Sequence, residues 1–384
     1  MERRRKVLFL IESLGGGGAE KVLSTLVEHI DKSRFDVTVC PITDVGPYSA
    51  DVKKFVTVKP ILPAYPGEGR FFARMMWRLK HRLVHRWLPE WLVYRLWIPK
   101  GNDVEVAFVE GFTTKLLSKS SGKAKKIAWV HTDLCNNHWT SAIYGSVEAE
   151  SKVYRAYDRV VGVSKGVSDS VNRLFGADLP TLTIYNPIDA AAIKKKAVAS
   201  NQNIPPRKEG FIRICSTGRF VSQKGFDRLL RIAGRLVGEG YKIELWLLGD
   251  GELRSEFERY IADNGLADTV TLWGFQSNPH AYMSQCDLFV CSSRAEGYST
   301  AVTEALILGL PVITTRCSGM DELLGVDGEF GVITDNSEEK LFDGLKWTLD
   351  HPDCLAEMAV KARERSGAFT IKNLVEPIEN FLDR

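Results

Sequence analysis

The sequence predicts an α/β protein made of two doubly wound domains, each with a parallel sheet flanked by helices. Short apolar runs such as KVLFLI and KIAWVH alternate with helical patterns such as AEKVLSTLVEHI in both halves of the chain. This alternation is typical of parallel strands joined by crossover helices. At 384 residues the chain also exceeds the size that one hydrophobic core usually serves, so two domains are expected.

Composition places the chain among globular proteins. Hydrophobic residues make up 44% and charged residues 26%, and a net charge of +3 is too small to indicate a nucleic-acid partner. The seven cysteines are scattered without the spacing of a zinc site, which indicates buried free thiols in a reducing cytosol. No run approaches 18 uninterrupted apolar residues, so we expect a cytoplasmic protein without a signal peptide or a transmembrane helix.

The domain boundary is predicted at a polar, lysine-rich stretch. The α/β pattern lapses over residues 186–210, which read NPIDAAAIKKKAVASNQNIPPRKEG and are interpreted as an interdomain linker. We therefore expect an N-terminal domain over residues 1–188 and a C-terminal domain over residues 189–370. Residues 371–384 carry apolar side chains at helical spacing, and this helix is expected to pack back across the boundary.

The glycine-rich loop in LIESLGGGGAEKVL is the first candidate binding site, with Gly15 to Gly18 between an expected strand and an expected helix. Glycine lets the backbone approach a ligand, and a helix N-terminus favours phosphate. The loop lacks the dinucleotide fingerprint, because Glu20 stands where its third glycine belongs, and it lacks the Lys-Ser/Thr of a Walker A loop. A tight structural turn is the alternative interpretation.

Two further candidates follow expected strands. The segment STGRFVSQKGFDRLL places Arg219 and Lys224 in one loop before a helix, a pair that suits a diphosphate, although a solvated loop would also explain it. The segment KIAWVHTD ends a strand in His131, followed by Asp133. Because a doubly wound sheet opens its ligand cleft at the carboxyl ends of its strands, we favour a functional over a structural role for His131.

Two carboxylates, Glu296 and Glu304, stand in the segment SSRAEGYSTAVTEALILGLPVITT. The segment predicts a loop, a short helix that Ser299 or Thr300 caps and Gly309 ends, and a strand. Carboxylates beside a helix N-terminus suit the hydroxyl groups of a polyol that carries a phosphate. An acidic first turn that complements the helix dipole would explain Glu304 alone, but it does not explain Glu296.

Residues 70–100 predict an amphipathic cationic helix. The segment RFFARMMWRLKHRLVHRWLPEWLVYRLWIPK holds four of the nine tryptophans and eight Lys or Arg residues against one acid. This mixture favours peripheral binding to an anionic membrane, and an insertion packed on its own domain is the alternative. The residues expected to contact the membrane are Arg74, Arg78, Arg82, Arg86, Trp77 and Trp87.

Together these motifs resemble the retaining glycosyltransferases of family 4, which have the GT-B fold of two facing Rossmann-like domains. The resemblance spans nearly the whole chain and rests on LGGGGAEKVL, WVHTD, VGVSKGVSDSV, IYNPID, GRFVSQKGFDRLL, LLGDGELR, LWGFQSN and EGYSTAVTEALILGLPVITT. The last motif contains the EX7E pattern of the family as Glu296 and Glu304. The chain departs from the family in reading EGYS instead of EGFG, and RCSGMDELL where a Gly-Gly pair is frequent.

The resemblance implies an acceptor site in the N-terminal domain and a nucleotide-sugar site in the C-terminal domain. Glu304 would hold the ribose hydroxyls, Glu296 would contact the transferred sugar, and His131 would lie near its reacting carbon. The implied catalytic residues are His131, Glu296, Arg219 and Lys224. The implied donor-binding residues are Gly16, Gly17, Gly18, Arg219, Lys224, Phe275, Gln276, Glu296, Tyr298, Ser299, Thr300 and Glu304.

The implied enzyme is a hexosyltransferase that moves a sugar from a nucleotide-sugar donor, with a UDP-sugar favoured, to a glycan or lipid-linked glycan in bacterial envelope or polysaccharide synthesis. Retention would follow a front-face path, with a glutamate nucleophile as the lesser alternative. No metal or other cofactor is expected, because no DXD motif ends a strand. The expected location is the inner face of the cytoplasmic membrane. A sugar-nucleotide epimerase of the same fold and a catalytically silent membrane-binding module are the other hypotheses.

Overall fold

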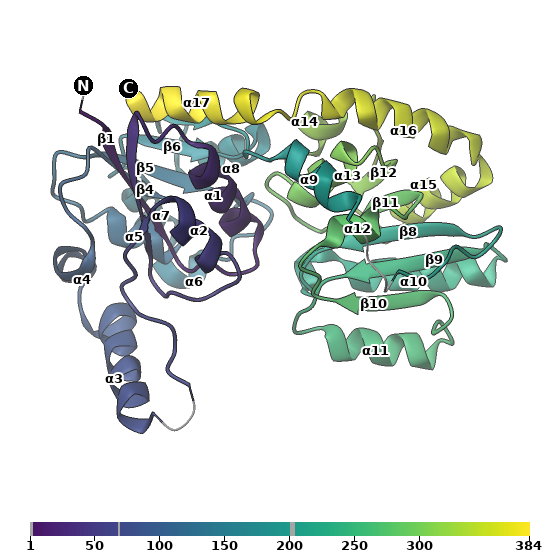
Figure 1. Ribbon diagram of the computed structural model, residues 1–384, viewed down its shortest axis with the longest axis horizontal. Helices are drawn as coiled ribbons and strands as arrows, with labels where there is room; N and C mark the ends of the chain where they lie inside the picture. The colour runs from purple at the N-terminus through teal and green to yellow at the C-terminus, as the bar shows by residue number, and fades with distance from the viewer. Residues whose placement is uncertain (1–2, 68–69, 200–203) are drawn as a thin grey trace. The chain divides into compact units, whose positions relative to one another are not determined.

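The computed structural model describes residues 3–67, 70–199 and 204–384 and divides the chain into two compact units (Figure 1). Unit 1 comprises Met1–Pro187 and Lys372–Arg384, and unit 2 comprises Ile188–Ile371. The borders expected from the sequence, after residues 188 and 370, each differ from these by one residue. All strand pairs in both units are parallel, which confirms the predicted class of two doubly wound α/β domains.

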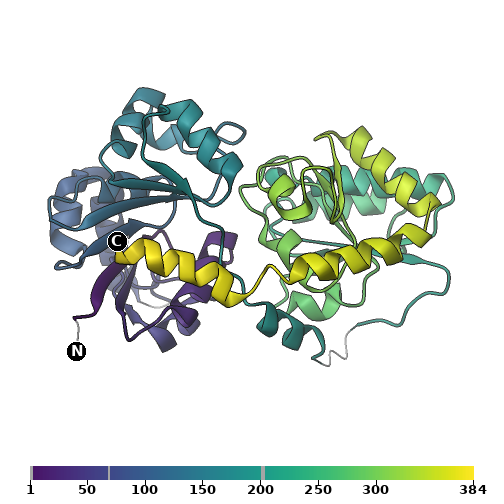
Figure 2. The same ribbon diagram turned by 90° about the horizontal axis from the view of Figure 1, so that it is seen from above.

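Unit 1 contains a seven-stranded sheet and the helices that flank it (Figures 1 and 2). Its elements are β1 (Arg5–Ile11), α1 (Gly18–His29), β2 (Phe35–Pro41), α2 (Ser49–Phe55), β3 (Thr57–Val58), α3 (Phe71–Arg82), the π-helical turn η1 (Leu83–Trp87), α4 (Glu90–Trp97), β4 (Val104–Ala107), α5 (Phe112–Leu117), β5 (Lys125–Val130), α6 (Ser141–Tyr144), α7 (Val147–Tyr154), β6 (Arg159–Gly162), α8 (Lys165–Phe175), β7 (Thr181–Thr183) and α17 (Ile371–Asp383). The strand order is β3-β2-β1-β4-β5-β6-β7, so the order reverses between β1 and β4. Strands covered on both faces read as continuous apolar runs, and β1 is fully buried from Val7 to Ile11.

Helix α17 packs on unit 1, although it follows the last helix of unit 2 in the sequence. The carboxylate of Glu379 accepts the backbone N–H of Asp31 at 2.7 Å and pairs with Arg34 at 3.1 Å. On the apolar side of the helix, Ile378 and Leu382 are fully buried. The described chain therefore ends on the unit in which it begins, and the guanidinium of Arg5 in β1 donates to the backbone carbonyl of Asp383 in α17.

Unit 2 contains a six-stranded sheet in the order β10-β9-β8-β11-β12-β13, which reverses between β8 and β11. Its elements are α9 (Ala190–Ala197), β8 (Ile212–Thr217), the 3-10 turn η2 (Ser222–Lys224), α10 (Phe226–Gly238), β9 (Ile243–Leu248), α11 (Arg254–Asp263), β10 (Val270–Gly274), α12 (Pro279–Met283), β11 (Leu288–Cys291), α13 (Thr300–Ile307), β12 (Val312–Thr315), α14 (Met320–Leu324), β13 (Val332–Thr334), α15 (Glu338–Asp350) and α16 (Asp353–Ser366).

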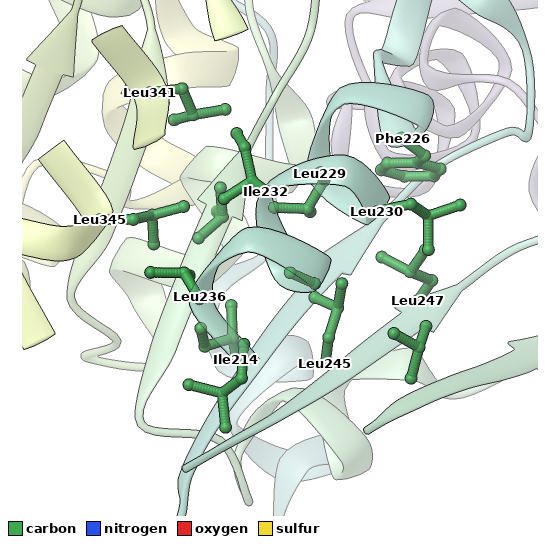
Figure 3. Close-up of a cluster of buried hydrophobic side chains, with 14 of the residues drawn as sticks. Ile214, Phe226, Leu229, Leu230, Ile232, Leu236, Leu245, Leu247, Leu341 and Leu345 are labelled. Carbon is green, nitrogen blue, oxygen red and sulfur yellow. The ribbon is translucent and has the colours of Figure 1, made fainter. Parts of the chain in front are cut away.

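The core of unit 2 lies between α10, α15 and the sheet (Figure 3). Apolar side chains recur along α10 at the three- and four-residue spacing that gives a helix one apolar face. Each fully buried Leu, Ile or Phe contributes roughly 1.5–3 kcal/mol through removal from water. The labelled members of the cluster are Ile214, Phe226, Leu229, Leu230, Ile232, Leu236, Leu245, Leu247, Leu341 and Leu345.

The structure corrects two sequence predictions about local elements. Part of the stretch expected to be a linker forms helix α9, because Asp189 caps its N-terminus and alanine and lysine are good helix formers. Residues 200–203 of that stretch lie outside the described residues. The basic segment is α3, η1 and α4 instead of one helix, because Pro89 forces Leu88 into an extended conformation with φ −98° and ψ 142°.

All seven cysteines are free thiols. Cys40, Cys215, Cys286 and Cys291 are buried, as the apolar strand-like runs around them predict. Cys135 is exposed, so the expectation of burial does not extend to it.

Candidate active site

The predicted site residues of unit 2 gather beside the reversal of its strand order. Lys224 follows β8, Glu296 follows β11, and the reversal lies between these two strands. Ligands of doubly wound sheets bind outside the carboxyl ends of the strands at such a point. The fold therefore brings Lys224 and Glu296 to the position where unit 2 is expected to bind a ligand.

Gly225 shapes the loop that carries the two predicted diphosphate ligands, Arg219 and Lys224. It turns the chain from η2 into α10 with φ of 65°, a conformation that favours glycine. A Cβ at this position would also lie 2.1 Å from the carbonyl oxygen of Ser292. Only glycine satisfies both requirements, and the turn fixes Lys224 against the loop that follows β11.

Lys224 and Glu296 form a direct ion pair. Nζ of Lys224 lies 2.7 Å from Oε1 of Glu296, and the hydroxyl of Ser293 donates to the same oxygen at 2.5 Å. Glu296 is buried, and the Lys224 side chain is 22% exposed. A buried charge is stable when it is paired and hydrogen-bonded. The structure thus brings Lys224, one of the two residues predicted for the diphosphate, into contact with Glu296, the residue predicted for the transferred sugar.

The ion pair keeps Lys224 charged. Burial alone would lower the pKa of Lys224, but the negative charge of Glu296 and the hydrogen bond to it raise that pKa above the usual value for lysine. Arg219 is exposed and, within the described residues, forms no ion pair, while its positive charge acts on Lys224. The loop therefore offers an anion one free guanidinium and one ammonium that a carboxylate orients.

The loop, helix and strand predicted for residues 292–315 are confirmed. Ser299 caps α13, and its hydroxyl accepts the N–H of Val302 at 3.3 Å. Gly309, with φ of 74°, follows the helix and precedes β12. Residues 298–300 lead into the helix at the carboxyl end of β11, and Tyr298 and Ser299 are buried. The N-terminus of α13 therefore lies where its dipole favours an anion at the binding edge of the sheet.

Glu304, the second predicted carboxylate, has a different partner. Its Oε2 atom lies 3.0 Å from Nε2 of His280 in α12. The side chains of His280 and Glu304 are only 3% and 5% exposed. His280 therefore fixes the orientation of the Glu304 carboxylate from inside unit 2.

The two residues predicted beside the nucleotide base follow β10. Phe275 is 62% exposed, so its aromatic ring is available to stack on a planar ligand. The side-chain amide of Gln276 donates to the carbonyl oxygen of Trp273 at 2.7 Å. The Gln276 side chain thus holds the loop after β10 together, and of these two residues Phe275 is the one whose side chain is exposed.

The glycine loop of unit 1 lies beside the reversal between β1 and β4. None of Gly15 to Gly18 has a positive φ, and Gly18 begins α1. A Cβ at Gly16 would meet nothing within 4 Å, whereas one at Gly17 would lie 2.3 Å from Oε2 of Glu20. Backbone dihedrals and packing therefore do not explain Gly16. An open approach to the N-terminus of α1 does explain it.

His131 follows β5 and lies against a buried carboxylate that the sequence analysis missed. Oε2 of Glu110 accepts the backbone N–H of His131 at 2.9 Å, and Oε1 of Glu110 accepts the indole N–H of Trp139 at 3.3 Å. Burial lowers the pKa of His131 to about 4, although the charge of Glu110 opposes this shift. Its Nε2 atom is buried without a partner among the described residues. The ring is therefore neutral, and one of its nitrogens has no hydrogen-bond partner among the described residues.

Asp133 has a structural role. Its carboxylate accepts the backbone N–H groups of Cys135 and Asn136 at 3.0 and 3.2 Å and the Asn136 side-chain amide at 2.7 Å. These bonds hold the turn that follows His131. Asp133 therefore supports His131 through the backbone and is not expected to contact a ligand.

Three residues that the sequence analysis did not select contact predicted site residues: Glu110 contacts His131 in unit 1, and in unit 2 Ser293 contacts Glu296 and His280 contacts Glu304. Glu110 follows the apolar run VEVAFV, so the position that identified His131 could also have identified Glu110. Nothing in the local pattern could have identified His280, because its role depends on the packing of α12 against α13.

Within the described residues, no group of three or more His, Cys, Asp or Glu side chains is arranged to hold a metal ion. Positive charge at the candidate site comes from Arg219 and Lys224. The two cations are the groups available to compensate the charge of a bound diphosphate.

The basic segment presents an apolar face to solvent. No residue of α3 is buried, and the helix projects from the body of unit 1 in Figure 1. Arg78, Arg82, Arg86 and Trp87 are exposed as predicted. The exposed apolar side chains of α3 are Phe71, Phe72, Met75, Met76 and Leu79.

Two members of the predicted membrane set instead attach α3 to its own unit. The Trp77 indole N–H donates to the carbonyl oxygen of Pro63 at 2.8 Å, and its ring packs edge-on against Tyr65. Arg74 donates to the Tyr65 hydroxyl at 3.0 Å. None of the described helices is both long and apolar enough to cross a bilayer.

Comparison with protein families accounts for both units. The family model for glycosyltransferase family 4 matches residues 16–192, and that for glycosyl transferases group 1 matches residues 198–365. The chain belongs to these glycosyltransferases. Its fold is therefore GT-B, and the protein is a transferase.

Known glycosyltransferases with similar sequences agree with this assignment. One relative is N-acetylgalactosamine-N,N'-diacetylbacillosaminyl-diphospho-undecaprenol 4-alpha-N-acetylgalactosaminyltransferase of Campylobacter jejuni. It is 28% identical to this chain, and the match covers 95% of this chain and 96% of that protein. A 129-residue match, 35% identical, links it to the lipopolysaccharide core biosynthesis glycosyltransferase LpsE of Rhizobium meliloti, over 34% of this chain and 36% of LpsE.

Solved structures show the same fold. Anabaena HepE in complex with UDP and glucose superposes with a TM-score of 0.75 at 19% identity, over 99% of this chain and 100% of HepE. The lipopolysaccharide outer core galactosyltransferase WaaB superposes with a TM-score of 0.64 at 16% identity, over 98% of each chain.

Proposed function

We propose that this glycosyltransferase moves a sugar from a UDP-sugar to a lipid-linked or polysaccharide glycan, with retention of anomeric configuration and without a metal ion. The observation that carries the proposal is the group formed by Arg219, Lys224 and Glu296 at the strand reversal of unit 2. The complexes of HepE with UDP and with UDP-glucose support the choice of donor. The undecaprenol-linked substrate named for the Campylobacter relative supports the choice of acceptor.

The proposed chemistry follows from charge. A departing nucleoside diphosphate gains negative charge in the transition state, and Arg219 and Lys224 are placed to stabilise it. Glu296 holds Lys224 in place and offers its remaining carboxylate oxygen to a sugar hydroxyl. The two side chains supply the compensation that a metal ion gives in other transferases, so the reaction is proposed to need no metal.

His131 is proposed to act as a neutral hydrogen-bonding group. Because burial lowers its pKa to about 4, its imidazole is uncharged at neutral pH. A neutral imidazole can donate a hydrogen bond to a hydroxyl or accept one from it, without adding charge to the site. In the proposed front-face reaction, the leaving phosphate takes the acceptor proton, and His131 orients the transferred sugar.

Product analysis tests this proposal. Purified protein is incubated with UDP-sugars and a lipid extract, and the anomeric configuration of the new bond is read by NMR. An α-linked product from an α-linked donor, formed equally with and without EDTA, is expected. A β-linked product would contradict retention, and loss of activity in EDTA would contradict metal independence.

A sugar-nucleotide epimerase is the second candidate, because the same nucleotide site would serve it. An epimerase would convert the donor in the absence of any acceptor. Donor turnover that requires the lipid extract therefore distinguishes the transferase from the epimerase.

We also propose that unit 1 binds the surface of an anionic membrane through α3. The supporting observation is the apolar face of α3, with Phe71 and Phe72 73% and 75% exposed, next to exposed arginines. Interfacial helices combine these features, with aromatic and aliphatic side chains in the acyl region and cations at the headgroups. Such binding would bring the enzyme to a lipid-linked acceptor at the inner face of the membrane.

A further inference from the structure

A basic groove runs along the amino-terminal edge of the unit 1 sheet. Its larger part is an open pocket of about 1270 Å³ at the amino ends of β1, β4 and β5, and a second pocket of about 820 Å³ extends it to the start of β6. Arg5, Asp103 and Lys123 line both pockets, so they form one continuous feature, here called the amino-edge groove.

The amino-edge groove is separate from the candidate active site. His131 and the glycine loop follow the carboxyl ends of β5 and β1, whereas the groove precedes the amino ends of the same strands. A strand of six residues such as β5 spans about 20 Å. The positive charge of the groove therefore has no direct part in holding a donor at the other edge.

Cations dominate the groove. Eight lysine or arginine side chains and three acidic ones line its larger pocket. Two of the acids pair with cations of the groove itself, and the charge of Glu105 acts on Lys100, so the acids offset only part of the positive charge. The partner pairs are Asp103 with Arg3, Glu105 with Tyr94, and Asp383 with Arg34.

Several groove cations lack any acidic partner. Among the described residues, Arg95 and Lys123 form no ion pair, and the guanidinium of Arg4 donates only to the backbone carbonyl of Lys32. The positive charges of the groove also act on one another. Burial lowers the pKa of Lys125, and the positive charges of Arg159 and Arg5 lower it further. An excess of uncompensated cations at a concave surface favours a ligand with several negative charges.

Helix α4 lines the groove through Trp91, Tyr94 and Arg95, and large apolar side chains are exposed on it and on the turn before it. Trp91 lines the larger pocket and is 53% exposed, and Leu96 on the same helix, α4, is 56% exposed. Trp87, in the turn before α4, is 57% exposed. Tryptophan beside cations is typical of surfaces that lie at the boundary between headgroups and acyl chains.

We propose that the amino-edge groove binds the phosphate groups of anionic lipid headgroups, with Trp91 entering the bilayer beside them. Arginine binds phosphate as a fork and lysine as a point charge, and the groove supplies both. A bilayer fits better than a nucleic acid, because α4 also exposes Leu96, an aliphatic side chain that gains from an acyl phase. The inference rests on the proposed membrane association and adds its headgroup site, independently of sugar transfer.

Vesicle sedimentation of the full chain tests the groove. The variant Arg95→Glu/Lys123→Glu reverses two unpaired groove charges, and Lys194→Glu/Lys195→Glu on the exposed side of α9 makes the same charge change elsewhere. Vesicles contain phosphatidylcholine with or without phosphatidylglycerol. We expect wild type and control to bind only the phosphatidylglycerol vesicles, and the groove variant to bind them about tenfold more weakly or worse. Equal melting temperatures of the three proteins show that folding is intact.

Other outcomes overturn the inference in distinguishable ways. Equal binding by the groove variant would leave membrane association to α3 alone. A wild type that binds neither vesicle would remove membrane association altogether, while sugar transfer would remain to be judged by its own assay. If pyrophosphate or a single-stranded oligonucleotide raises the melting temperature of the wild type and not of the groove variant, and no vesicle binds, the ligand is not a bilayer.

Discussion

Removal of Lys224 is expected to destabilise unit 2 chiefly through the carboxylate that it leaves behind. Two unit charges 2.7 Å apart attract each other by roughly 6 kcal/mol at an effective dielectric constant of about 20. Desolvation offsets several kcal/mol of this attraction for each ion, so the net coupling is about 1–3 kcal/mol. Lys224→Met additionally leaves Glu296 buried and uncompensated, which brings its total cost to about 3–5 kcal/mol.

A double-mutant cycle measures this coupling. Lys224→Met, Glu296→Gln and the double variant are unfolded in urea, and the free energies of unfolding are compared with that of the wild type. Glu296→Gln keeps the shape of the side chain and removes its charge, so the double variant is expected to be more stable than Lys224→Met alone. Additive effects of the two substitutions would refute the view that the ion pair organises the site.

Three further outcomes are expected. Because burial lowers the pKa of His131 to about 4, the neutral ring stabilises the fold above pH 6.5, and this contribution is lost as the pH falls toward 4. The melting temperature of His131→Asn is therefore expected to fall less steeply than that of the wild type between pH 6.5 and 4. Equal slopes for the two proteins would contradict the assignment. His280→Ala removes the side chain that orients Glu304, so the nucleotide affinity measured by calorimetry is expected to fall about tenfold. His280→Gln keeps a hydrogen-bond donor and is expected to recover part of that affinity. Equal affinities in all three proteins would show that the contact has no role in binding. Phe72→Ser/Met76→Ser removes part of the exposed apolar face of α3 and is expected to reduce sedimentation with vesicles. The melting temperature should stay unchanged, since neither side chain is buried. Sedimentation equal to that of the wild type would exclude α3 as a membrane contact.

The sequence predicts the fold well because its local signals agree with one another. Apolar strand runs mark the sheets, and Ser299 and Gly309 delimit α13 where their chemistry requires. Predictions fail where a local pattern permits two outcomes. Residues 190–197 are polar enough for a linker, yet Asp189 caps them into a helix, and Pro89 divides a periodic cationic segment that reads as one helix.

The site is less predictable because its residues meet through tertiary packing. The sequence places Lys224 and Glu296 at strand ends, but their direct contact depends on the turn at Gly225 and the neighbouring positions of β8 and β11. His280 acts on Glu304 across two packed helices, and no spacing rule relates them. The amino-edge groove draws cations from segments separated along the chain, so net charge alone does not reveal it.

Donor binding tests the central claim most directly. Thermal unfolding is followed with UDP-, GDP-, ADP- and dTDP-sugars for the wild type and for Arg219→Ala, which removes an exposed cation without disturbing the core. A ligand at 100 times its dissociation constant stabilises the folded state by about 2.7 kcal/mol. We predict a raised melting temperature with a UDP-sugar that Arg219→Ala abolishes. No shift with any nucleotide sugar, or an equal shift in Arg219→Ala, would contradict the account.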